Sequence, residues 1–311
     1  MRELVAIAAF ALAVALLPAF VSSGFVLNLA IMVLYSTLLG QAWNLLAGFG
    51  GQYSFGHALF FGTGAYTSAA LQVHLGVNAW LALPAALACG AAAGVLVGAL
   101  SFRYGLRGSY FALVTLAFAE VFRILANSVA FTGGGVGLLL PLRESAAGMQ
   151  FGKIGFLYLI LVLVLAGFLL SWWLKRSRFG ARLAAVRDGE ESAAALGVDV
   201  FRVKLAAIAM SAALMAAGGV FYVQYFHYID PHIAYGPAVS VEALLGPIVG
   251  GLGTVFGPLL GAAALQVLGE LTRNLAGDVP GLSLVAYGVA LVAMVMFLPR
   301  GFAGLFVRRG A

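Results

Sequence analysis

The sequence predicts an all-α integral membrane protein, a polytopic helical bundle of about 8–10 transmembrane helices. Two observations predict this fold: 63% of the 311 residues are hydrophobic, and only 9% are charged. A water-soluble chain carries about 25% charged residues, so we expect much of the surface to face lipid. Helices are the expected form of the apolar runs, because a helix satisfies its own backbone hydrogen bonds where no water is present.

Eight apolar runs are long enough to span a bilayer, which takes about 20 residues. They lie at residues 4–20, 25–47, 79–100, 109–130, 155–174, 205–226, 259–276 and 281–298. Two shorter or more broken runs, at 55–73 and 239–251, would bring the number of spans to ten. The first run has features of a secretory signal, but a second span follows almost at once, so we expect an uncleaved first helix.

The basic residues are unevenly distributed and indicate an orientation. If ten spans alternate from a cytoplasmic N-terminus, 13 of the 17 Lys and Arg residues fall on one face of the membrane. These are Arg2, Arg103, Arg107, Lys175, Arg176, Arg178, Arg182, Arg187, Arg202, Lys204, Arg300, Arg308 and Arg309. The positive-inside rule makes that face cytoplasmic and places both termini there. The net charge of +6 therefore indicates a membrane-lipid environment, and we expect no nucleic-acid partner.

Two glycine-rich segments interrupt the apolar runs, near 48–66 ("GFGGQYSFGHALFFGTGAY") and 246–262 ("GPIVGGLGTVFGPLLGA"). Glycine permits irregular backbone, and such backbone survives at membrane depth only where protein or a water-filled cavity covers it. Paired glycine-broken segments in a transporter indicate the translocation pathway. The alternative interpretation is close helix packing through small residues, which is common in membrane proteins.

Several kinds of chemistry have no signature in the sequence. There is no G-x-x-x-x-G-K-[ST] motif, so this chain has no phosphate-binding loop of that type. The four histidines lack the spacing of metal ligands, and we predict no metal site and no catalytic residues. The single cysteine, Cys89, cannot form a disulfide within the chain.

Three carboxylates within or beside the apolar runs could couple transport to an ion gradient. Glu120 and Glu270 are each followed three residues later by an arginine, which can form an ion pair along a helix. Glu242 follows Ser240 at a predicted helix start, where the helix dipole favours a carboxylate. These structural explanations are the favoured ones, and an ion-coupled carrier stays open as an alternative.

The segment 175–204 is the most polar part of the chain and is predicted to be cytoplasmic. From Ala181 to Leu196 it has the pattern of a short amphipathic helix, with Gly197 as the stop signal. One interpretation is a solvated helix near anionic lipid headgroups. The other is a helix that docks into a groove of a partner protein, which suits a membrane protein without its own ATP motif.

Four stretches, in this order along the chain, resemble the LivM-type permeases, the membrane subunits of branched-chain amino-acid ABC importers. They are "AWNLLAGFGGQYSFGHALFFGTGAYTSA", "LRGSYFALVTLAFAEVFR", "SRFGARLAAVRDGEESAAALGVDVFRVKL" and "IVGGLGTVFGPLLGA". The resemblance runs over about residues 35–302. It implies a single transmembrane permease domain over residues 1–311, with a cytoplasmic coupling segment at 175–204.

The resemblance also implies a coupling helix that contacts an ATPase subunit. This helix matches Arg182 to Gly197, although Ser192 interrupts the acidic-Ala-Ala pattern that importer permeases carry before the glycine. The residues expected to take part in coupling are Arg182, Arg187, Glu190, Glu191 and Gly197.

The family implies a set of partners and a location. The partners are two ATP-binding-cassette ATPase subunits, a second related permease subunit, and a periplasmic or extracellular substrate-binding protein. ATP and Mg would be used by the ATPase subunits, so we expect this chain to bind no cofactor and to be a non-catalytic transport subunit. The expected location is the bacterial cytoplasmic (inner) membrane.

The predicted function is therefore inward translocation of branched-chain or related amino acids, energised by separate ATPases. A pathway for aliphatic zwitterions needs apolar walls and a few hydrogen-bonding groups. The predicted lining residues are Asn44, Gln52, Ser54, His57, Thr63 and Tyr66, although the small neighbours of His57 favour a packing role for that residue. The alternatives are a urea or other small-solute ABC permease, an ion-coupled secondary carrier, and a passive channel.

Overall fold

The structure is a computed structural model that describes residues 2–21, 23–141 and 148–276, together with five single residues beyond them. The predicted all-α membrane fold is confirmed. Within the described ranges the only strands are β1 (Leu138–Leu139) and β2 (Tyr228–Ile229), which pair antiparallel. Most of the last predicted span, 281–298, lies outside the described residues, as do Arg300, Arg308 and Arg309.

Nine of the ten predicted runs are helices in the described part of the chain. In chain order the helices are α1 (Arg2–Phe20), α2 (Gly24–Asn44), α3 (His57–Leu75), α4 (Ala79–Arg103), α5 (Gly108–Ser128), α6 (Lys153–Arg176), α7 (Arg178–Asp188), α8 (Glu190–Ala195), α9 (Val200–Phe226), α10 (Pro231–Tyr235), α11 (Pro237–Gly250) and α12 (Gly257–Ala276). A π-helical turn, η1 (Leu45–Phe49), continues α2, and two 3-10 turns, η2 (Ala130–Thr132) and η3 (Gly134–Val136), precede β1.

Seven helical segments among the described residues are long and apolar enough to cross a membrane. They are Glu3–Phe20, Gly24–Phe49, Ala79–Arg103, Gly108–Ser128, Lys153–Arg176, Val200–Phe226 and Pro231–Gly250. The last of these joins α10 to α11, so the predicted run at 239–251 is the second part of a longer, bent segment. The chain is therefore a multi-pass membrane protein, and α3 and α12 add two further helices to the bundle.

Helix α9 begins five residues before the predicted start of its run at residue 205. The Asp199 side chain accepts a hydrogen bond from the backbone N–H of Arg202, with a donor–acceptor distance of 3.0 Å. This cap satisfies one of the free N–H groups at the helix start. It extends α9 over two polar residues, Arg202 and Lys204, that the hydropathy pattern excludes.

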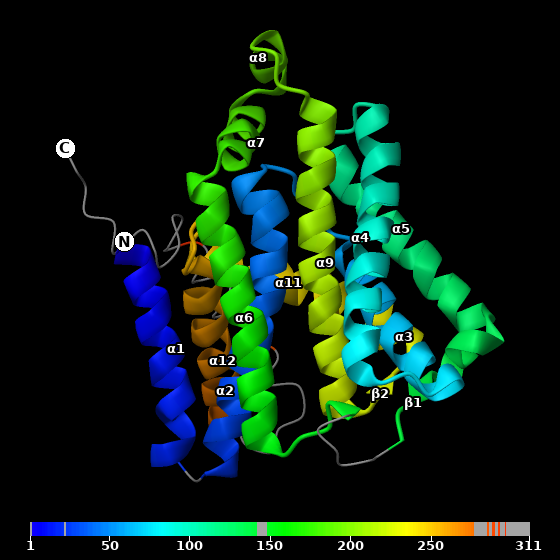
Figure 1. Cartoon of the computed structure of the whole chain (residues 1–311), viewed down its shortest axis with the longest axis vertical. Helices are drawn as coiled ribbons and strands as arrows, with labels where there is room; N and C mark the ends of the chain where they lie inside the picture. Colours follow the sequence, from blue (N-terminus) through cyan, green and yellow to red (C-terminus); the bar gives the residue numbers. More distant parts are fainter. Residues whose placement is uncertain are drawn as a thin grey trace.

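The bundle has two distinct ends (Figure 1). Helices α7 and α8 project at one end, called here the α7–α8 end, whereas β1 and β2 lie at the opposite end, the β1–β2 end. Two ion pairs bring other helix ends to the α7–α8 end: Lys175 to Glu3 at the start of α1, and Arg107 to Glu190 from the α4–α5 turn. The basic residues near the α6–α7 junction and the α4–α5 turn therefore gather on one side, as the charge distribution predicts.

Helix α9 is the centre of the packing. It contacts α3, α4 and α2, and its buried face is rich in small residues such as Ala212 and Ala216. Small residues on both partners let the backbones approach closely, which is how membrane helices gain packing energy without a hydrophobic driving force. Gly64 of α3 lies directly against α9, where an added Cβ would come 2.7 Å from the Ala216 Cβ.

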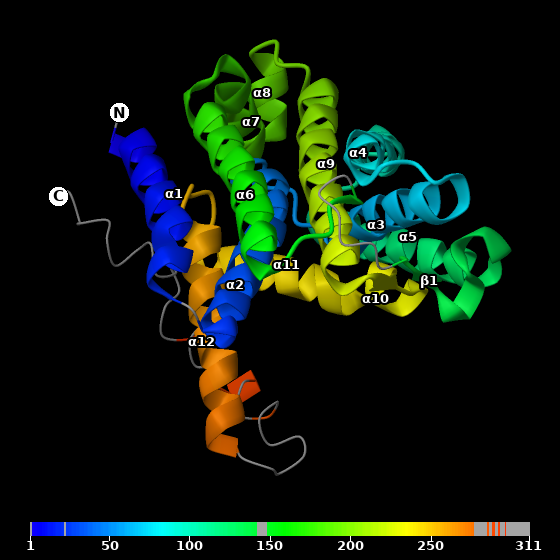
Figure 2. The ribbon, with the colours of Figure 1, turned by 60° about the horizontal axis from the view of Figure 1, so that its bottom comes forward.

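Helices α10 and α11 run across the other helices rather than along them (Figure 2). Beyond them α12 extends away from the bundle, and it packs against α11 and α2. The start of α12 lies close to the end of α11, where Gly246 and Gly250 meet Gly257 and Gly261. The second glycine-rich segment therefore forms the tight α11–α12 junction.

We predict that Gly64→Ala destabilises the bundle by about 1–3 kcal/mol, because overpacking forces α3 and α9 apart. This loss exceeds the gain of about 1 kcal/mol that Ala brings to a helix interior. The measurement is the thermal unfolding of the purified protein in detergent. Gly246→Ala is the matched control: its new methyl would have its nearest neighbour at 3.5 Å, so its melting temperature should be unchanged or higher. Equal effects of the two variants would contradict the close α3–α9 contact.

Candidate translocation and coupling site

The two glycine-rich segments lie against each other, and Asn44 joins them. The Asn44 Oδ1 accepts a hydrogen bond from the Gly253 N–H at 2.9 Å, and its Nδ2 donates to the Thr254 carbonyl at 3.0 Å. The carbonyl and the amino group of the buried Asn44 amide thus both form hydrogen bonds with the α11–α12 junction. The approach is close, since a Cβ on Gly48 would lie 2.6 Å from the Gly253 nitrogen. The expected packing role of these glycines is therefore present at this contact.

The chain between α2 and α3 is irregular, as the glycines predict. The α-helix widens to the π turn η1, and Gly51 then adopts a positive φ of 68°. The following extended segment is held back against α2, because the Trp43 indole Nε1 donates to the Ser54 carbonyl at 2.8 Å. Protein covers this irregular backbone on one side, since Gln52, Ser54 and Gly56 are buried whereas Tyr53 and Phe55 are exposed. Irregular backbone in a membrane requires such cover or a water-filled cavity.

Three of the predicted lining residues are fully buried and hydrogen-bonded within the chain. Besides Asn44, these are Ser54, whose Oγ accepts from the Gly56 N–H at 3.2 Å, and His57, whose Nε2 lies 3.0 Å from the Ser211 Oγ. The Ser211 hydroxyl donates to the Ala42 carbonyl at 2.6 Å, so Nε2 of His57 is the donor. The packing role favoured for His57 agrees with this geometry, and contact of these residues with substrate stays a prediction.

The other predicted lining residues lie apart from this group. Thr63 and Tyr66 lie about 1.7 and 2.5 turns beyond His57 on α3. The Thr63 hydroxyl donates to the Leu59 carbonyl at 2.7 Å, and the Tyr66 ring stacks on Tyr235 of α10 with ring centroids 5.8 Å apart. The structure therefore gathers Asn44, Ser54 and His57 at the α2–α3 junction but leaves Thr63 and Tyr66 in a separate layer.

Gln52 belongs to a polar cluster that includes the coupling segment. Its Nε2 lies 3.3 Å from the Glu190 Oε1, and the same carboxylate oxygen accepts from the Lys204 Nζ at 2.7 Å. The other oxygen, Oε2, accepts from the Arg107 Nε at 3.0 Å. Lys204 is only 3% exposed and Glu190 13%, so their charges neutralise each other away from water. Glu190 thus ties α8 to α9, to the α4–α5 turn and to the glycine-rich segment.

Arg187 makes a second contact between the coupling segment and the glycine-rich segment. Its Nη1 donates to the Gly48 carbonyl at 3.4 Å, and its aliphatic stem covers Gly51, where a Cβ would lie 2.6 Å from the Arg187 Cγ. The guanidinium also pairs with Asp188 through its Nε at 3.0 Å. Any side chain at residue 51 would push this arginine away, which explains a glycine there beyond its positive φ.

The predicted single helix from Ala181 to Leu196 is wrong. The structure has two helices, α7 and α8, separated by Gly189 in an extended conformation with φ 176° and ψ 105°. The amphipathic pattern alone does not reveal the break, but the Asp188-Gly189 pair is a local signal for it, because Asp-Gly dipeptides favour turns. The break accompanies the inward position of Glu190, which bonds to Lys204 of α9 and Arg107.

The remaining predicted coupling residues face outward. Arg182 and Gly197 are exposed and border a cavity of about 450 Å³ between α7 and the start of α9. The Glu191 side chain is 90% exposed, and Leu196 is 83% exposed at the rim of the same cavity. The coupling segment therefore has an inner face bonded to the bundle and an outer face that nothing in the described chain covers.

The expected ion pairs of the two outer carboxylates are confirmed. Glu120 forms a two-point pair with Arg123, at 2.8 Å and 2.5 Å, and Glu270 pairs with Arg273 at 3.3 Å. The explanation for Glu242 is wrong, because α11 begins at Pro237 and places Glu242 beyond its first turn. Glu242 accepts instead from the Ser36 hydroxyl of α2 at 2.6 Å.

Comparison with known proteins places the chain in a family. The family model described as "branched-chain amino acid transport system / permease component" matches residues 25–298. The chain belongs to this family. It is similar to the high-affinity branched-chain amino acid transport system permease protein LivM of Salmonella typhimurium, with 32% identity over 91% of this chain and 71% of the relative. For LivM of Escherichia coli the identity is also 32%, over 96% of this chain and 74% of the relative.

More distant relatives show that the resemblance extends to a second type of permease. LivH of Salmonella typhimurium is 24% identical over 86% of this chain and 90% of its own length. The family and these relatives establish the role of the chain as a membrane permease component rather than an enzyme.

Several residues of the site escape sequence reasoning. The sequence indicates Arg107 and Lys204 only as markers of orientation, yet both bind Glu190. Ser211, Ser36 and Gln266 lie in apolar helices, and each forms a hydrogen bond to a residue more than 150 positions away. No local signal could have identified these pairs, because each partner is brought in by helix packing.

We predict that Glu190→Gln lowers the free energy of unfolding by about 3–5 kcal/mol, since it leaves the buried Lys204 ammonium unpaired. The measurement is the thermal unfolding of the purified protein. Glu191→Gln is the matched control, because its exposed ion pair should contribute less than about 1 kcal/mol. Adding Lys204→Met to Glu190→Gln should recover most of the loss. A similar effect of the two single variants would contradict an inward role for Glu190.

Proposed function

We propose that this chain is the permease subunit of an ABC importer that moves branched-chain amino acids inward across the bacterial cytoplasmic (inner) membrane. The observation that carries the proposal is the match of residues 25–298 to the permease family, together with the similarity to LivM along most of the chain. The names of these relatives give branched-chain amino acids as what they transport. Urea or another small solute is the alternative cargo.

In the proposed orientation the α7–α8 end is cytoplasmic. Support comes from the basic residues gathered there, which include Arg107, Lys175 and Lys204, and from the positive-inside rule. The ion pair of Lys175 with Glu3 supports a cytoplasmic position for the start of α1. We propose the same side for the C-terminus.

The proposed partners follow from this orientation. Two ATPase subunits would bind at the cytoplasmic side, one of them on the outer face of α7 and α8, and would supply ATP and Mg²⁺ chemistry that this chain does not need to hold. A second related permease would complete the pathway, and a substrate-binding protein would dock at the β1–β2 end. Similarity of the chain to both LivM and LivH supports a paired, related permease.

The proposed coupling mechanism depends on those residues of the coupling segment, 175–204, that face the bundle. When an ATPase moves α8, Glu190 transmits the displacement to α9 through Lys204 and to the α4–α5 turn through Arg107. Arg187 and Gln52 transmit it to the glycine-rich segment at the α2–α3 junction. ATP binding can shift the populations of inward- and outward-open states only if the ATPase contacts differ between them, and the ionic contacts of Glu190 would link those ATPase contacts to the bundle.

An ion-coupled mechanism through Glu120 or Glu270 is less favoured by the geometry. Both carboxylates are engaged by an arginine on the same helix, so each already has a counter-charge nearby. A coupling carboxylate must exchange its cation during the cycle. A passive channel is likewise disfavoured by the projecting, two-faced coupling segment.

The test of the proposed function is uptake of labelled leucine into proteoliposomes that hold this chain, its partner permease and the ATPases. The binding protein is added outside and ATP inside. We expect accumulation against the gradient that requires ATP. Uptake by this chain alone, indifferent to ATP, would overturn the proposal.

We predict that Leu196→Asp reduces ATP-dependent leucine uptake and co-purification of the ATPase at least about tenfold. Placing a charge in an apolar contact costs more than 1.4 kcal/mol, the equivalent of that factor. Since Leu196 is 83% exposed, the melting temperature of the variant should stay unchanged. Leu139→Asp, at another exposed position, in β1 (71%), is the control for ATPase co-purification. Normal ATPase binding by Leu196→Asp would contradict docking at this face.

A further inference from the structure

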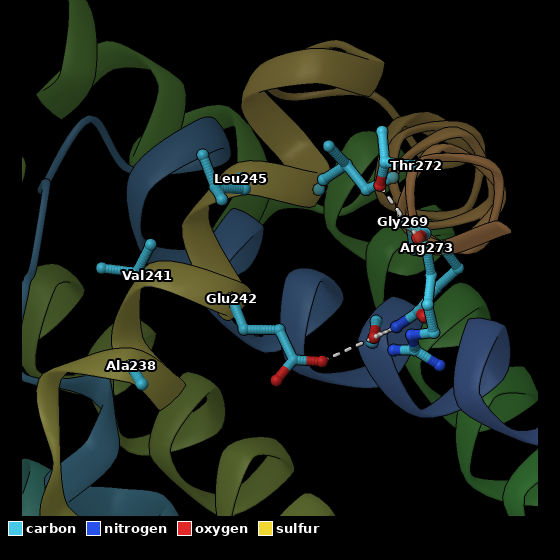
Figure 3. Close-up of a pocket in the computed structure, with 12 residues that line it drawn as sticks. Ala238, Val241, Glu242, Leu245, Gly269, Thr272 and Arg273 are labelled. Atoms are coloured by element: carbon cyan, nitrogen blue, oxygen red, sulfur yellow. Dashed lines mark hydrogen bonds between the residues drawn. The ribbon is translucent and has the colours of Figure 1, made fainter. Parts of the chain in front are cut away.

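A cavity lies between α2, α11 and α12, away from the α2–α3 junction (Figure 3). Its volume is about 660 Å³, within the range of about 300–1,000 Å³ typical of small-molecule sites. Its walls are mainly aliphatic, with Val241, Leu245 and Leu265 among the lining residues. None of the residues predicted from the sequence to line the pathway borders this cavity.

Glu242 is the carboxylate on the wall of this cavity. It lies in the membrane-spanning segment Pro231–Gly250, on the part of α11 that faces α2 and α12. An ionisable residue inside a membrane is costly and indicates a functional site. The helix-start explanation fails for this residue, so its position needs another reason.

Glu242 differs from the other glutamates that the structure describes. Each of the others has a basic partner within ion-pair distance; they are Glu3, Glu120, Glu190, Glu191 and Glu270. Within the described ranges, Glu242 forms no ion pair with a Lys, Arg or His. A carboxylate at membrane depth without a cation of its own is placed to receive one from a ligand.

A hydrogen-bond chain fixes the orientation of this carboxylate. The Gln266 Nε2 donates to the Ser36 Oγ at 2.8 Å, and the Ser36 hydroxyl donates to the Glu242 Oε1 at 2.6 Å. The two hydrogen bonds run in series toward the carboxyl group, so its Oε1 is an acceptor. Among the described residues no hydrogen bond engages its second oxygen, Oε2. One oxygen is therefore held in place while the other is available on the cavity side.

The opposite wall supplies a positive group. Arg273 of α12 lines the same cavity, and its pair with Glu270 uses Nη1 only. Figure 3 shows Glu242 and Arg273 projecting from the two helices that face each other across the space. A carboxylate, a guanidinium and aliphatic walls form the complement of an amino-acid zwitterion with an aliphatic side chain.

We propose that this cavity is a binding site for aliphatic amino acids on the translocation pathway, with Glu242 as the acceptor for the α-ammonium group and Arg273 as the partner for the α-carboxylate. The ligand class rests on the proposed function, which supplies branched-chain amino acids as cargo. Ser36 and Gln266 are positioning residues, since they act through Glu242 and hold its carboxylate toward the cavity.

The first test measures the charge preference of the site by thiol labelling of the assembled importer. Val241→Cys places a thiol beside Glu242 on the cavity wall, in a Cys89→Ser background. We expect 2-aminoethyl methanethiosulfonate, a cation, to react about tenfold faster than its neutral methyl analogue, because a nearby uncompensated carboxylate concentrates cations. Glu242→Gln should abolish the preference, Glu242→Asp should retain it, and Glu120→Gln is the control that should leave it unchanged. Equal rates of the two reagents would overturn the proposal.

The second test identifies the ligand and needs no substitution at Glu242. Leucine should slow labelling of the introduced thiol several-fold, whereas 4-methylpentanoate, with the same carboxylate and aliphatic chain but no ammonium, should not. Equal protection by the two compounds, or protection by neither, would overturn the proposal. ATP-dependent leucine uptake by the same proteoliposomes tests the proposed function separately. Active uptake with no ammonium-dependent protection would reject the site and keep the importer.

Discussion

The buried ion pair between Lys204 and Glu190 is the constraint on which the coupling end of the protein depends. Burying either charge without its partner would cost free energy in a low-dielectric environment. The position of α8 is therefore coupled to that of Lys204 on α9. Because Arg107 and Gln52 bind the same carboxylate, this requirement fixes α8 against three separate parts of the bundle. It also accounts for the break at Gly189, which turns Glu190 inward while Glu191 and Leu196 stay on the surface.

The two glycine-rich segments serve this same connection from the side of the bundle. Asn44 fastens the α2–α3 junction to the α11–α12 junction, and Arg187 rests on the glycines of the first. A place on the translocation pathway and close helix packing are the two interpretations of these glycines. The structure shows the packing, and it occurs together with irregular backbone, because such backbone in a membrane must be covered and glycine lets a second backbone approach closely. A role of these segments in the pathway stays a prediction.

The cavity beside Glu242 gives the molecule a second polar region, separate from the coupling cluster. The two regions use carboxylates in opposite ways. Glu190 is bonded to two cations of its own chain, Lys204 and Arg107, whereas among the described residues Glu242 has one neutral donor, the Ser36 hydroxyl. Helix α2 connects them physically, since Ser36 lies near its middle and Asn44 at its end. An event at the coupling end and an occupant of the cavity would therefore act on one rigid helix.

The sequence by itself determined the membrane class, nine of the helices, the side on which basic residues gather and the family. Each of these depends on local composition or on motifs read along the chain. Only the tertiary structure decided that Glu190 faces inward and that, among the described residues, Glu242 has no ion-pair partner whereas Glu120 has one. The physical reason is that helix packing brings together charged residues that are far apart in the sequence. Local sequence patterns therefore do not show which ionic partner such a residue has.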